Sequence, residues 1–458
     1  MSQLDHLNRT SASLTGDKTP PRFKVFMARH LDGLDVLKRL PEETVFEMKV
    51  VASVLPFRVN EYVINHLIDW DAVPNDPIYQ LTFPQRGMLS EEAFERMAAL
   101  HRADAPRDEI QRLAQELRAD LNPHPAGQME LNMPRDEDGD VLDGMQHKYN
   151  ETVLFFPSQG QTCHAFCTFC FRWAQFVGQQ ELRMASTEAG ALHGYLESRK
   201  EVSDLLVTGG DPMVMKTAKL AGYLEPLLSE RFEHVQTIRI GTKALTYWPH
   251  RFVFDDDADD MLRLFDTLVE EGKHVSVMAH FNHWRELESP VTREAIRRIR
   301  DTGAQIRAQG PLLAHINDDA SVWARMWETQ VKLGVVPYYM FVERDTGARH
   351  YFEVPLERAW HIYRDAIQQV SGLARTVRGP SMSAGPGKVE VQGVTEIAGE
   401  KVFALRFLQG RNADWVHRPF YAKYDPKATW LDHLKPAFGE SRFFFEEEYA
   451  TMQNPRLA

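Results

Sequence analysis

The three cysteines of the chain lie in one short run, and their spacing can hold a metal cluster. Cys163, Cys167 and Cys170 are the only cysteines among the 458 residues. Three thiolates are one ligand short of the closed set of four that structural zinc requires. A cubane iron–sulfur cluster tolerates three protein ligands, because its fourth iron stays open to bind a molecule that is not protein. The spacing therefore predicts a four-iron, four-sulfur ([4Fe–4S]) cluster on these three cysteines.

Two other interpretations of the cysteine run stay open. A nearby histidine, His147 or His164, could complete a zinc site, or the three cysteines could be unrelated buried residues. Chance clustering of every cysteine in the chain is improbable. A motif nevertheless stays a hypothesis until its structural context agrees with it.

A second segment of chemical interest combines two glycines with an acidic residue. Gly209, Gly210 and Asp211 follow an apolar run and precede Pro212. Because glycine has no Cβ, the backbone there can approach a ligand where any other residue would clash. In isolation such a segment is more often a tight turn than a binding site. Its place one expected strand after the cysteine run favours a binding site.

A lysine preceded by glycines is a candidate nucleophile. Lys388 follows Gly385, Pro386 and Gly387, after the last helix expected in the strand–helix region. A lysine held in a partly desolvated loop can lose its proton and form a Schiff base with pyridoxal phosphate (PLP). The alternative is an ordinary surface loop.

These segments belong to a region in which short apolar runs alternate with amphipathic stretches, the pattern of successive strand–helix units. Helices are expected at Leu192–Ser198 and Ile296–Ile299. About six units in a row imply a parallel sheet with outer helices, either an open barrel or a doubly wound sheet. In barrels the loops after the strands form the active site, and the cysteine run follows the first strand. The expected strands are Val153–Phe156, Asp204–Thr208, Thr237–Ile240, His274–Ala279, Gln305–Ala308 and Pro337–Val342.

The chain divides into three regions by pattern. Residues 1–145 are expected to be mainly helical, with helices such as Glu43–Val54 and Glu91–Leu100, and to end in an acidic linker. Residues 146–390 form the expected α/β region, which would carry the PLP site. Residues 391–458 form a C-terminal extension. Its aromatic run near residues 442–449 could contact another subunit or could pack onto its own barrel.

Composition and charge limit the class of protein. The chain is 43% hydrophobic and 26% charged, as in ordinary globular proteins, and its formal net charge of −12 disfavours a nucleic-acid partner. It has no apolar run of about 18 residues, and its first residues lack the blocks of a signal peptide. Three cysteines fit a reducing compartment better than a disulfide framework. We expect a cytoplasmic enzyme with a small-molecule substrate and no nucleic-acid or membrane partner.

Together these motifs resemble those of the lysine 2,3-aminomutase family of radical S-adenosylmethionine (SAM) enzymes. The likeness runs from roughly residue 56 to residue 394, in order and at compatible spacing, so it is far more specific than any single motif. The segments that carry it are the cysteine run with Phe171-Arg172, and residues 204–212, 238–242, 280–283, 309–313, 316–318 and 337–339.

The resemblance implies a fold, cofactors and an activity. The fold would be a partial (β/α)6 radical SAM barrel with a helical N-terminal region and a C-terminal extension, and the cofactors a [4Fe–4S] cluster, SAM and PLP. The activity would be that of an isomerase, an amino-acid 2,3-aminomutase that converts an α-amino acid into its β isomer. Cofactors must carry this chemistry, because no side-chain acid or base breaks an unactivated C–H bond. A reductant such as flavodoxin or ferredoxin and a homo-oligomer are expected as well.

The resemblance also implies roles for single residues. Lys388 would hold PLP and Lys148 would lie near its phosphate, while Thr152 replaces a second basic residue. Arg172 would bind the substrate α-carboxylate, although a surface ion pair is the commoner fate of an arginine. The residues implied near SAM are Gly209, Gly210, Asp211, His280 and Gln309; the last two could instead be ordinary polar residues at strand ends.

Two positions depart from the lysine-specific members, in which two aspartates hold the substrate's side-chain ammonium. Ser381, seven residues before Lys388, and Arg344 take their places. Such a site would repel free lysine and accept a neutral or acidic amino acid such as glutamate. Asp345 follows directly, so a shift of one residue in the alignment would restore an acid and lysine specificity.

Other departures concern the oligomer and the reaction. No cysteine follows Cys170, which excludes the structural zinc site of some family members, so any oligomer must be held by packing. Pro386 inside the glycine run is also unusual and weakens the case for Lys388. The alternatives left open are a lysine 2,3-aminomutase, a radical SAM enzyme of another reaction type without PLP, and a non-catalytic iron–sulfur protein.

Overall fold

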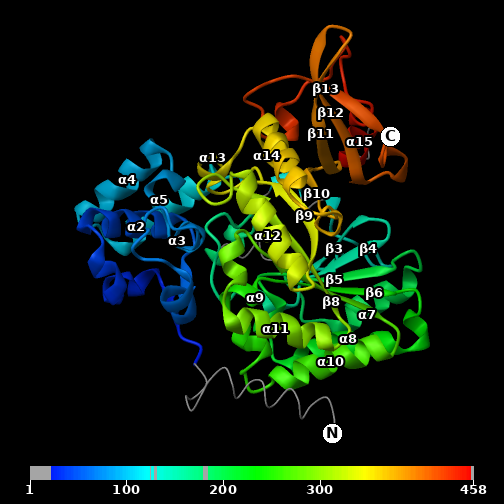
Figure 1. The fold of residues 1–458 in the computed structure, drawn as a ribbon, viewed down its shortest axis with the longest axis horizontal. Helices are drawn as coiled ribbons and strands as arrows, with labels where there is room; N and C mark the ends of the chain where they lie inside the picture. Colours follow the sequence, from blue (N-terminus) through cyan, green and yellow to red (C-terminus); the bar gives the residue numbers. More distant parts are fainter. Residues whose placement is uncertain (1–21, 124, 128–130, 179–183, 455–458) are drawn as a thin grey trace.

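The mixed α/β architecture is built on one long sheet. The structure is a computed structural model that describes residues 22–123, 125–127, 131–178 and 184–454. Within them, an 11-stranded sheet runs from β3 (Met145–Tyr149) to β13 (Pro419–Lys423), and every strand lies beside its neighbour in sequence. Figure 1 shows the N-terminal helices at one side of this sheet and the last strands at its far end.

The central strands are parallel to one another, as predicted. Each pairs in parallel with the next from β4 to β10, and β8 continues to Leu312 instead of ending at Ala308. This unbroken order excludes the doubly wound alternative, in which the strand order reverses at a switch point. The strands are β4 (Thr152–Phe155), β5 (Asp204–Val207), β6 (Thr237–Thr242), β7 (His274–His280), β8 (Gln305–Leu312), β9 (Val336–Val342) and β10 (Arg378–Ser383).

The two faces of the parallel strands carry different residues. In β6, Ile238 and Ile240 are fully buried in the main hydrophobic core, so Arg239 between them lies on the opposite face. Crossovers of one hand between successive strands place all the connecting helices on the apolar face. Those helices are α7 (Ala189–Ser198), α8 (Thr217–Leu224), α9 (Ala244–Tyr247), α10 (Ala258–Glu270), α11 (Pro290–Asp301), α12 (Ala320–Lys332), α13 (Arg349–Phe352) and α14 (Leu356–Gln369). Polar chemistry is therefore concentrated on the other face and at the strand ends.

The described residues of the N-terminal region include several helices and also a two-stranded antiparallel sheet of β1 (Val25–Met27) and β2 (Arg58–Asn60). Its apolar residues belong to the same core as those of the parallel strands. The region is therefore packed onto the sheet over a wide contact. Its helices are α2 (Glu42–Val54), α3 (Pro77–Thr82), α4 (Glu91–Arg102) and α5 (Arg107–Ala119).

The C-terminal extension continues the sheet. β11 (Gly387–Ile397), β12 (Glu400–Gly410) and β13 add three antiparallel strands beyond β10, and α15 (Glu446–Gln453) follows. Phe443 and Phe445 of the aromatic run are 5% and 3% exposed, inside a second hydrophobic core. Of the two alternatives for this run, packing onto its own sheet is the one the structure shows. In the described part of the chain, no helix combines the length and apolarity needed to cross a bilayer.

Candidate active site

The cysteine loop follows β4, where the sequence placed it, and the N-terminal region fixes its path. The backbone N–H of Phe166 donates to the carbonyl oxygen of Arg58 at 2.8 Å, and that of Thr168 donates to Leu81 at 3.0 Å. The Thr168 hydroxyl also donates to the Gln80 carbonyl oxygen at 2.7 Å. The helical region thus positions the loop, a role that its sequence did not indicate.

The three thiols form no disulfide and are poorly solvated. Burial raises the pKa of all three, that of Cys170 to about 12, and the other two thiols raise the pKa of Cys163 further. Such thiols are weak free nucleophiles at neutral pH, whereas a bound metal deprotonates its thiol ligands outright. The chemistry of these donors suits ligation more than nucleophilic attack.

The zinc alternative finds little support in the geometry. His147 is engaged elsewhere, because its ring nitrogens bond the Tyr195 hydroxyl at 2.7 Å and the Asn150 carbonyl oxygen at 3.1 Å. Among the described residues, no group of three or more His, Cys, Asp and Glu side chains is arranged to hold a metal ion. Sulfurs on three irons of a cubane lie farther apart than sulfurs on one ion. Four buried polar atoms in or beside the loop have no hydrogen-bond partner among the described residues: Arg58 Nε, Gln161 Oε1, His164 Nδ1 and Arg172 Nη1. The residues present fit a cluster with a polar non-protein ligand.

Asp211 fastens the end of β5 to the cysteine loop. Its carboxylate, 2% exposed, accepts hydrogen bonds from the Thr242 hydroxyl at 2.7 Å and the Lys243 backbone N–H at 2.9 Å. Its own N–H donates to the Thr162 carbonyl oxygen at 2.7 Å. Burial raises the pKa of this carboxyl to about 6. Asp211 is thus a positioning residue in this structure.

The two glycines lie in the same attachment. A Cβ on Gly210 would collide with the Thr162 backbone, and one on Gly209 with the Gln161 side chain, while the close approach of a ligand to this backbone stays a prediction. Gly209 also has a φ of +151°, which favours glycine. The partner that needs the space is the cysteine loop itself.

Lys388 lies at the start of β11, not in the loop that the sequence predicted. Its Nζ donates to Gln409 Oε1 at 3.1 Å and lies 4.1 Å from the centre of the Tyr339 ring. Burial, with help from the positive charges of Arg239 and Arg378, lowers the pKa of Lys388 to about 7. A large share of this amine is therefore uncharged at neutral pH, as a carbonyl-attacking lysine requires.

Further cations surround the segment before Lys388. Lys148 Nζ donates to the Ala384 carbonyl oxygen at 2.5 Å, and Arg411 Nε donates to that of Gly385 at 2.9 Å. Burial and the charges of Arg411, Arg344 and Lys388 lower the pKa of Lys148 well below its usual value. Such a cluster of cations is suited to an anion such as a phosphate.

Thr152, where the resemblance implied a second basic residue, donates its hydroxyl to Asp204 at 3.0 Å. The same carboxylate also pairs with the Arg239 guanidinium, whose Nε lies 2.8 Å from Oδ1. Thr152 therefore lies beside an ion pair between the neighbouring strands β5 and β6. Sequence comparison at position 152 alone gives no sign of Arg239.

Arg172 is buried and Arg344 is half-buried, and each has a guanidinium nitrogen that is shielded from water. Arg172 is 8% exposed and lies 4.1 Å from the Phe156 ring centre, and burial lowers its pKa to about 10. Burial also lowers the pKa of Arg344, which faces the Phe171 ring at 5.1 Å. Arg172 Nη1 and Arg344 Nε have no hydrogen-bond partner among the residues that the structure describes. Their positive charges also act on each other.

Ser381 and Asp345 both bear on the predicted substrate specificity. Ser381 is fully buried on β10, and its hydroxyl lacks a partner within the described ranges. Asp345 is held by Asn122 of the N-terminal region, whose Nδ2 donates to the Asp345 carbonyl oxygen at 2.6 Å and to Oδ2 at 3.3 Å. Its other carboxylate oxygen, Oδ1, is buried without a partner in this part of the structure. Burial raises the pKa of the adjacent Glu343 well above its usual value, which favours the uncharged acid.

His280 and Gln309 pair across the ends of β7 and β8. The His280 ring stacks on Phe169 of the cysteine loop with 5.7 Å between ring centres, and burial lowers the pKa of His280 to about 3. This histidine is therefore neutral, and its Nδ1 has no partner among the described residues. The structure brings both residues to the edge of the sheet beside the cysteines.

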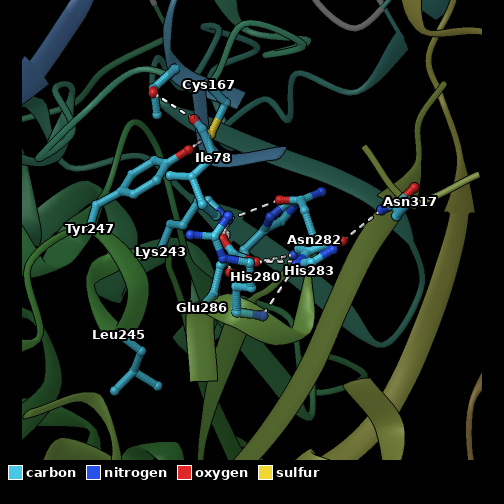
Figure 2. Close-up of polar contacts among 12 residues, drawn as sticks. Ile78, Cys167, Lys243, Leu245, Tyr247, His280, Asn282, His283, Glu286 and Asn317 are labelled. Atoms are coloured by element: carbon cyan, nitrogen blue, oxygen red, sulfur yellow. Dashed lines mark hydrogen bonds and ion pairs between the residues drawn. The ribbon is translucent and has the colours of Figure 1, made fainter. Parts of the chain in front are cut away.

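A buried network beside Cys167 was missed by sequence reasoning. Lys243 Nζ donates to Glu286 Oε1 at 2.6 Å and to Asn282 Oδ1 at 2.9 Å, and Tyr247, on the helix α9 that follows Lys243, contacts Cys167 through its hydroxyl (Figure 2). Lys243 and Glu286 are 43 positions apart, so no local pattern links them. Only the adjacency of β6 and β7 brings these residues together.

Comparison with solved structures gives only a weak likeness. The crystal structure of Streptococcus suis SuiB bound to S-adenosylmethionine aligns with a TM-score of 0.33 and 14% identity, over 69% of this chain and 68% of that chain. The crystal structure of SuiB bound to the precursor peptide SuiA gives the same TM-score at 13% identity. Nothing further is drawn from these alignments.

Comparison with curated sequences is more decisive. No family model matches. The L-lysine 2,3-aminomutases of Bacillus subtilis and Escherichia coli are 28% and 27% identical, over 57% and 54% of this chain and 53% and 69% of their own lengths. A protein of Aquifex aeolicus, provisionally named L-lysine 2,3-aminomutase, is 30% identical over 406 residues, which cover 88% of this chain and 94% of that protein. Because the likeness spans nearly the whole of that relative, the chain belongs to the lysine 2,3-aminomutase family, whose radical SAM enzymes use a [4Fe–4S] cluster, SAM and PLP.

Proposed function

We propose that the protein is a 2,3-aminomutase for an acidic α-amino acid, with glutamate as the favoured substrate. The supporting observation is that Arg172 and Arg344 each keep a buried nitrogen without a partner in the described part of the chain. An unmet buried polar group costs about 1–3 kcal/mol, and more when it is charged. The two carboxylates of a dicarboxylic amino acid would satisfy both guanidinium groups.

Free lysine fits this site less well. Its side-chain ammonium would need a negative partner in place of Arg344. Of the two acids beside Arg344, Glu343 is favoured in its uncharged form, and Asp345 is already bound through one oxygen by Asn122. A neutral amino acid would leave Arg344 unpaired. These contacts support the acidic substrate over both alternatives.

The roles of the other residues follow the same proposal. Cys163, Cys167 and Cys170 would hold the cluster, and His280 and Gln309 would border the SAM that occupies its open iron. Gly209, Gly210 and Asp211 would keep the cysteine loop in place beside that SAM. When bound, the cofactors supply the hydrogen abstraction and the nitrogen migration that side chains cannot perform.

The chain's own residues orient the substrate and exclude water from the reacting centre. Lys388 would bind PLP covalently, and Lys148 would contact its phosphate. Arg172 would hold the α-carboxylate and Arg344 the side-chain carboxylate, which fixes both ends of the substrate. The buried walls around Ser381 would keep solvent out.

The architecture is part of the proposal. The consecutive parallel strands and their helices support a partial (β/α)6 barrel, with residues 1–145, 146–390 and 391–458 as its three regions. A cytoplasmic homo-oligomer held by packing, reduced by a flavodoxin or ferredoxin, remains an expectation from the sequence.

The test is an anaerobic assay of the reconstituted protein with dithionite, SAM and PLP. Lysine, glutamate, glutamine, arginine and alanine are offered separately, and the β-amino acids formed are identified by mass spectrometry. We expect a β product from glutamate and none from lysine. Turnover of lysine alone would show that Asp345 supplies the acid. Formation of 5′-deoxyadenosine without any β product would indicate another radical reaction.

A further inference from the structure

A buried polar network lies behind the cysteine loop and is not used in the roles assigned above. Lys243 Nζ donates to Glu286 Oε1 at 2.6 Å, to Asn282 Oδ1 at 2.9 Å and to the His280 carbonyl oxygen at 3.2 Å. Glu286 is fully buried, and its second oxygen accepts from the backbone N–H groups of Asn282 and His283. Because all three ammonium hydrogens and both carboxylate oxygens have partners, this network is a rigid support.

Tyr247 connects that support to the cluster loop. It lies on the short helix α9, is 1% exposed, and places its hydroxyl 3.4 Å from Cys167 Sγ (Figure 2). Cys167 is the only hydrogen-bond partner of this hydroxyl within the described residues. Lys243 Nζ lies 4.9 Å from the centre of the Tyr247 ring and so limits its movement.

The backbone of Tyr247 is tied to the same loop. Asn60 Nδ2 donates to the Tyr247 carbonyl oxygen at 2.7 Å and to the His164 carbonyl oxygen at 3.2 Å. Asn60 itself is fully buried. A single amide therefore bridges α9 to the segment between Cys163 and Cys167. The distance between the Tyr247 hydroxyl and the sulfur is fixed from both sides.

The direction of the hydrogen bond follows from ligation. A thiolate bound to iron has no proton, so it can only accept, and the phenol hydroxyl must donate. Hydrogen bonds to cluster sulfurs stabilise the more negative, reduced cluster and so raise its reduction potential. We propose that Tyr247 is a positioning residue of the cluster: it holds Cys167 and makes the [4Fe–4S] centre easier to reduce. This inference rests on the proposed cluster at the three cysteines.

The redox step affected is a one-electron reduction. One electron passes from dithionite, or from a flavodoxin-type donor in the cell, to the oxidised [4Fe–4S]2+ cluster and gives the [4Fe–4S]1+ form. The donor is oxidised by one electron. No bond is broken and no proton moves, because Tyr247 keeps its hydrogen in both states. The hydrogen bond changes only the relative energy of the two states.

The test compares Tyr247→Phe with the wild type after identical anaerobic reconstitution. Iron and sulfide per chain report cluster content, and a dithionite titration followed by electron paramagnetic resonance gives the midpoint potential. We expect a full cluster with a more negative midpoint, so that a smaller fraction is reduced at a fixed solution potential. A full cluster with an unchanged midpoint would overturn the proposal.

A matched control separates this effect from general disturbance. Tyr62 is also buried, at 6% exposed, but its hydroxyl donates to Ser289 Oγ at 2.8 Å and not to a sulfur. Tyr62→Phe should leave the midpoint unchanged. An equal shift in this control would overturn the specific role of Tyr247.

A second variant covers the case in which Tyr247→Phe loses iron. Incorporation of 2,3-difluorotyrosine at position 247 keeps the shape and makes the hydroxyl a stronger donor, so the midpoint should rise. A midpoint that stays the same in this variant would overturn the tuning role. If the wild type itself held fewer than four irons and did not cleave SAM, the proposed function would fail. An intact wild-type cluster that does not respond to position 247 would remove this inference alone.

Discussion

Lys243 and Arg344, two cations of the site, differ in whether a protein group of opposite charge pairs with them. Lys243 has Glu286 as a charged partner and donates all three of its hydrogens to protein acceptors. Arg344 forms no ion pair within the described residues, and its Nε has no hydrogen-bond partner there. Lys243 is 9% exposed and Arg344 is half-buried, but the Nε of Arg344 is itself shielded from water. The difference shows that a satisfied buried cation belongs to the framework, whereas an unsatisfied one marks the place of a ligand.

This comparison predicts opposite effects of mutation. Removal of a partner from the Lys243 network should destabilise the fold, because it leaves a buried charge unpaired. Removal of Arg344 should have little effect on the fold, because its side chain forms no ion pair or hydrogen bond within the described residues and only faces the Phe171 ring. Removal of Arg344 should lower activity more than removal of a partner from the Lys243 network.

The largest expected effect on stability comes from Glu286→Ala. This change leaves Lys243 buried without its carboxylate, which should cost about 3–5 kcal/mol of unfolding free energy. The midpoint of urea unfolding, measured on the reconstituted protein, should fall accordingly. Glu288→Ala is the matched control, since Glu288 is 49% exposed and pairs with Arg325 at the surface. That control should lose about 0–1 kcal/mol, and an equal loss in both variants would contradict the comparison.

The largest expected effect on activity comes from Arg344→Met. The loss of a buried partner for the substrate's second carboxylate should cost about 2–5 kcal/mol in kcat/KM for glutamate. That corresponds to roughly thirtyfold to several thousandfold at 1.4 kcal/mol per factor of ten. The unfolding midpoint should not fall. Arg349→Met, which removes a half-buried pair with Glu353, should leave kcat/KM unchanged. If Arg344→Met retained full turnover of glutamate, the acidic substrate would be wrong.

The parallel strands were predictable because their signal is local. Each expected strand between residues 153 and 342 is present. These strands could be predicted because their apolar runs, and the glycine or polar residues that bound them, are visible in the sequence. The antiparallel strands β11 to β13 were not predicted. Their residues lie beyond the last strand–helix unit. Their pairing depends on contacts such as that of Val391 with Leu405, which the periodicity of the sequence does not predict.

The candidate site also contains some residues that the sequence indicated and others that it did not. The cysteine run, the glycine pair and Lys388 could be chosen as candidates because each lies in a contiguous stretch of sequence. Lys243, Glu286 and Tyr247 were missed because their neighbours are set by the order of the strands. The contact of Gly210 with the Thr162 backbone was also not predicted, because it joins two different loops.

Substitution at Ser381 and Arg344 can supply the acid that the pocket lacks. In the variant that combines Ser381→Asp with Arg344→Asp, the pocket gains two carboxylates and loses a cation. Glutamate should then be repelled and lysine accepted, with the ratio of their kcat/KM values shifting about 10–100-fold, equivalent to roughly 1.4–2.8 kcal/mol. Turnover of both amino acids, measured in competition by mass spectrometry, tests this change. An unchanged ratio would mean that neither position contacts the substrate side chain.

The smallest expected effect concerns pH and Lys388, a buried amine that has a neutral hydrogen-bond partner, Gln409, and no ion pair within the described residues. Burial and the charges of Arg239 and Arg378 lower its pKa to about 7, so the uncharged amine becomes the main form above that pH. The rate of covalent PLP binding, followed by absorbance after mixing with the PLP-free protein, should rise about tenfold per pH unit below 7 and level off above it, as expected for an amine titrating at its own pKa. A lysine with an ordinary pKa would instead show a rate that keeps rising towards pH 10. The folded state binds fewer protons than the unfolded chain between pH 7 and the usual lysine pKa of about 10.4, so this group's contribution to stability should also increase with pH across that window.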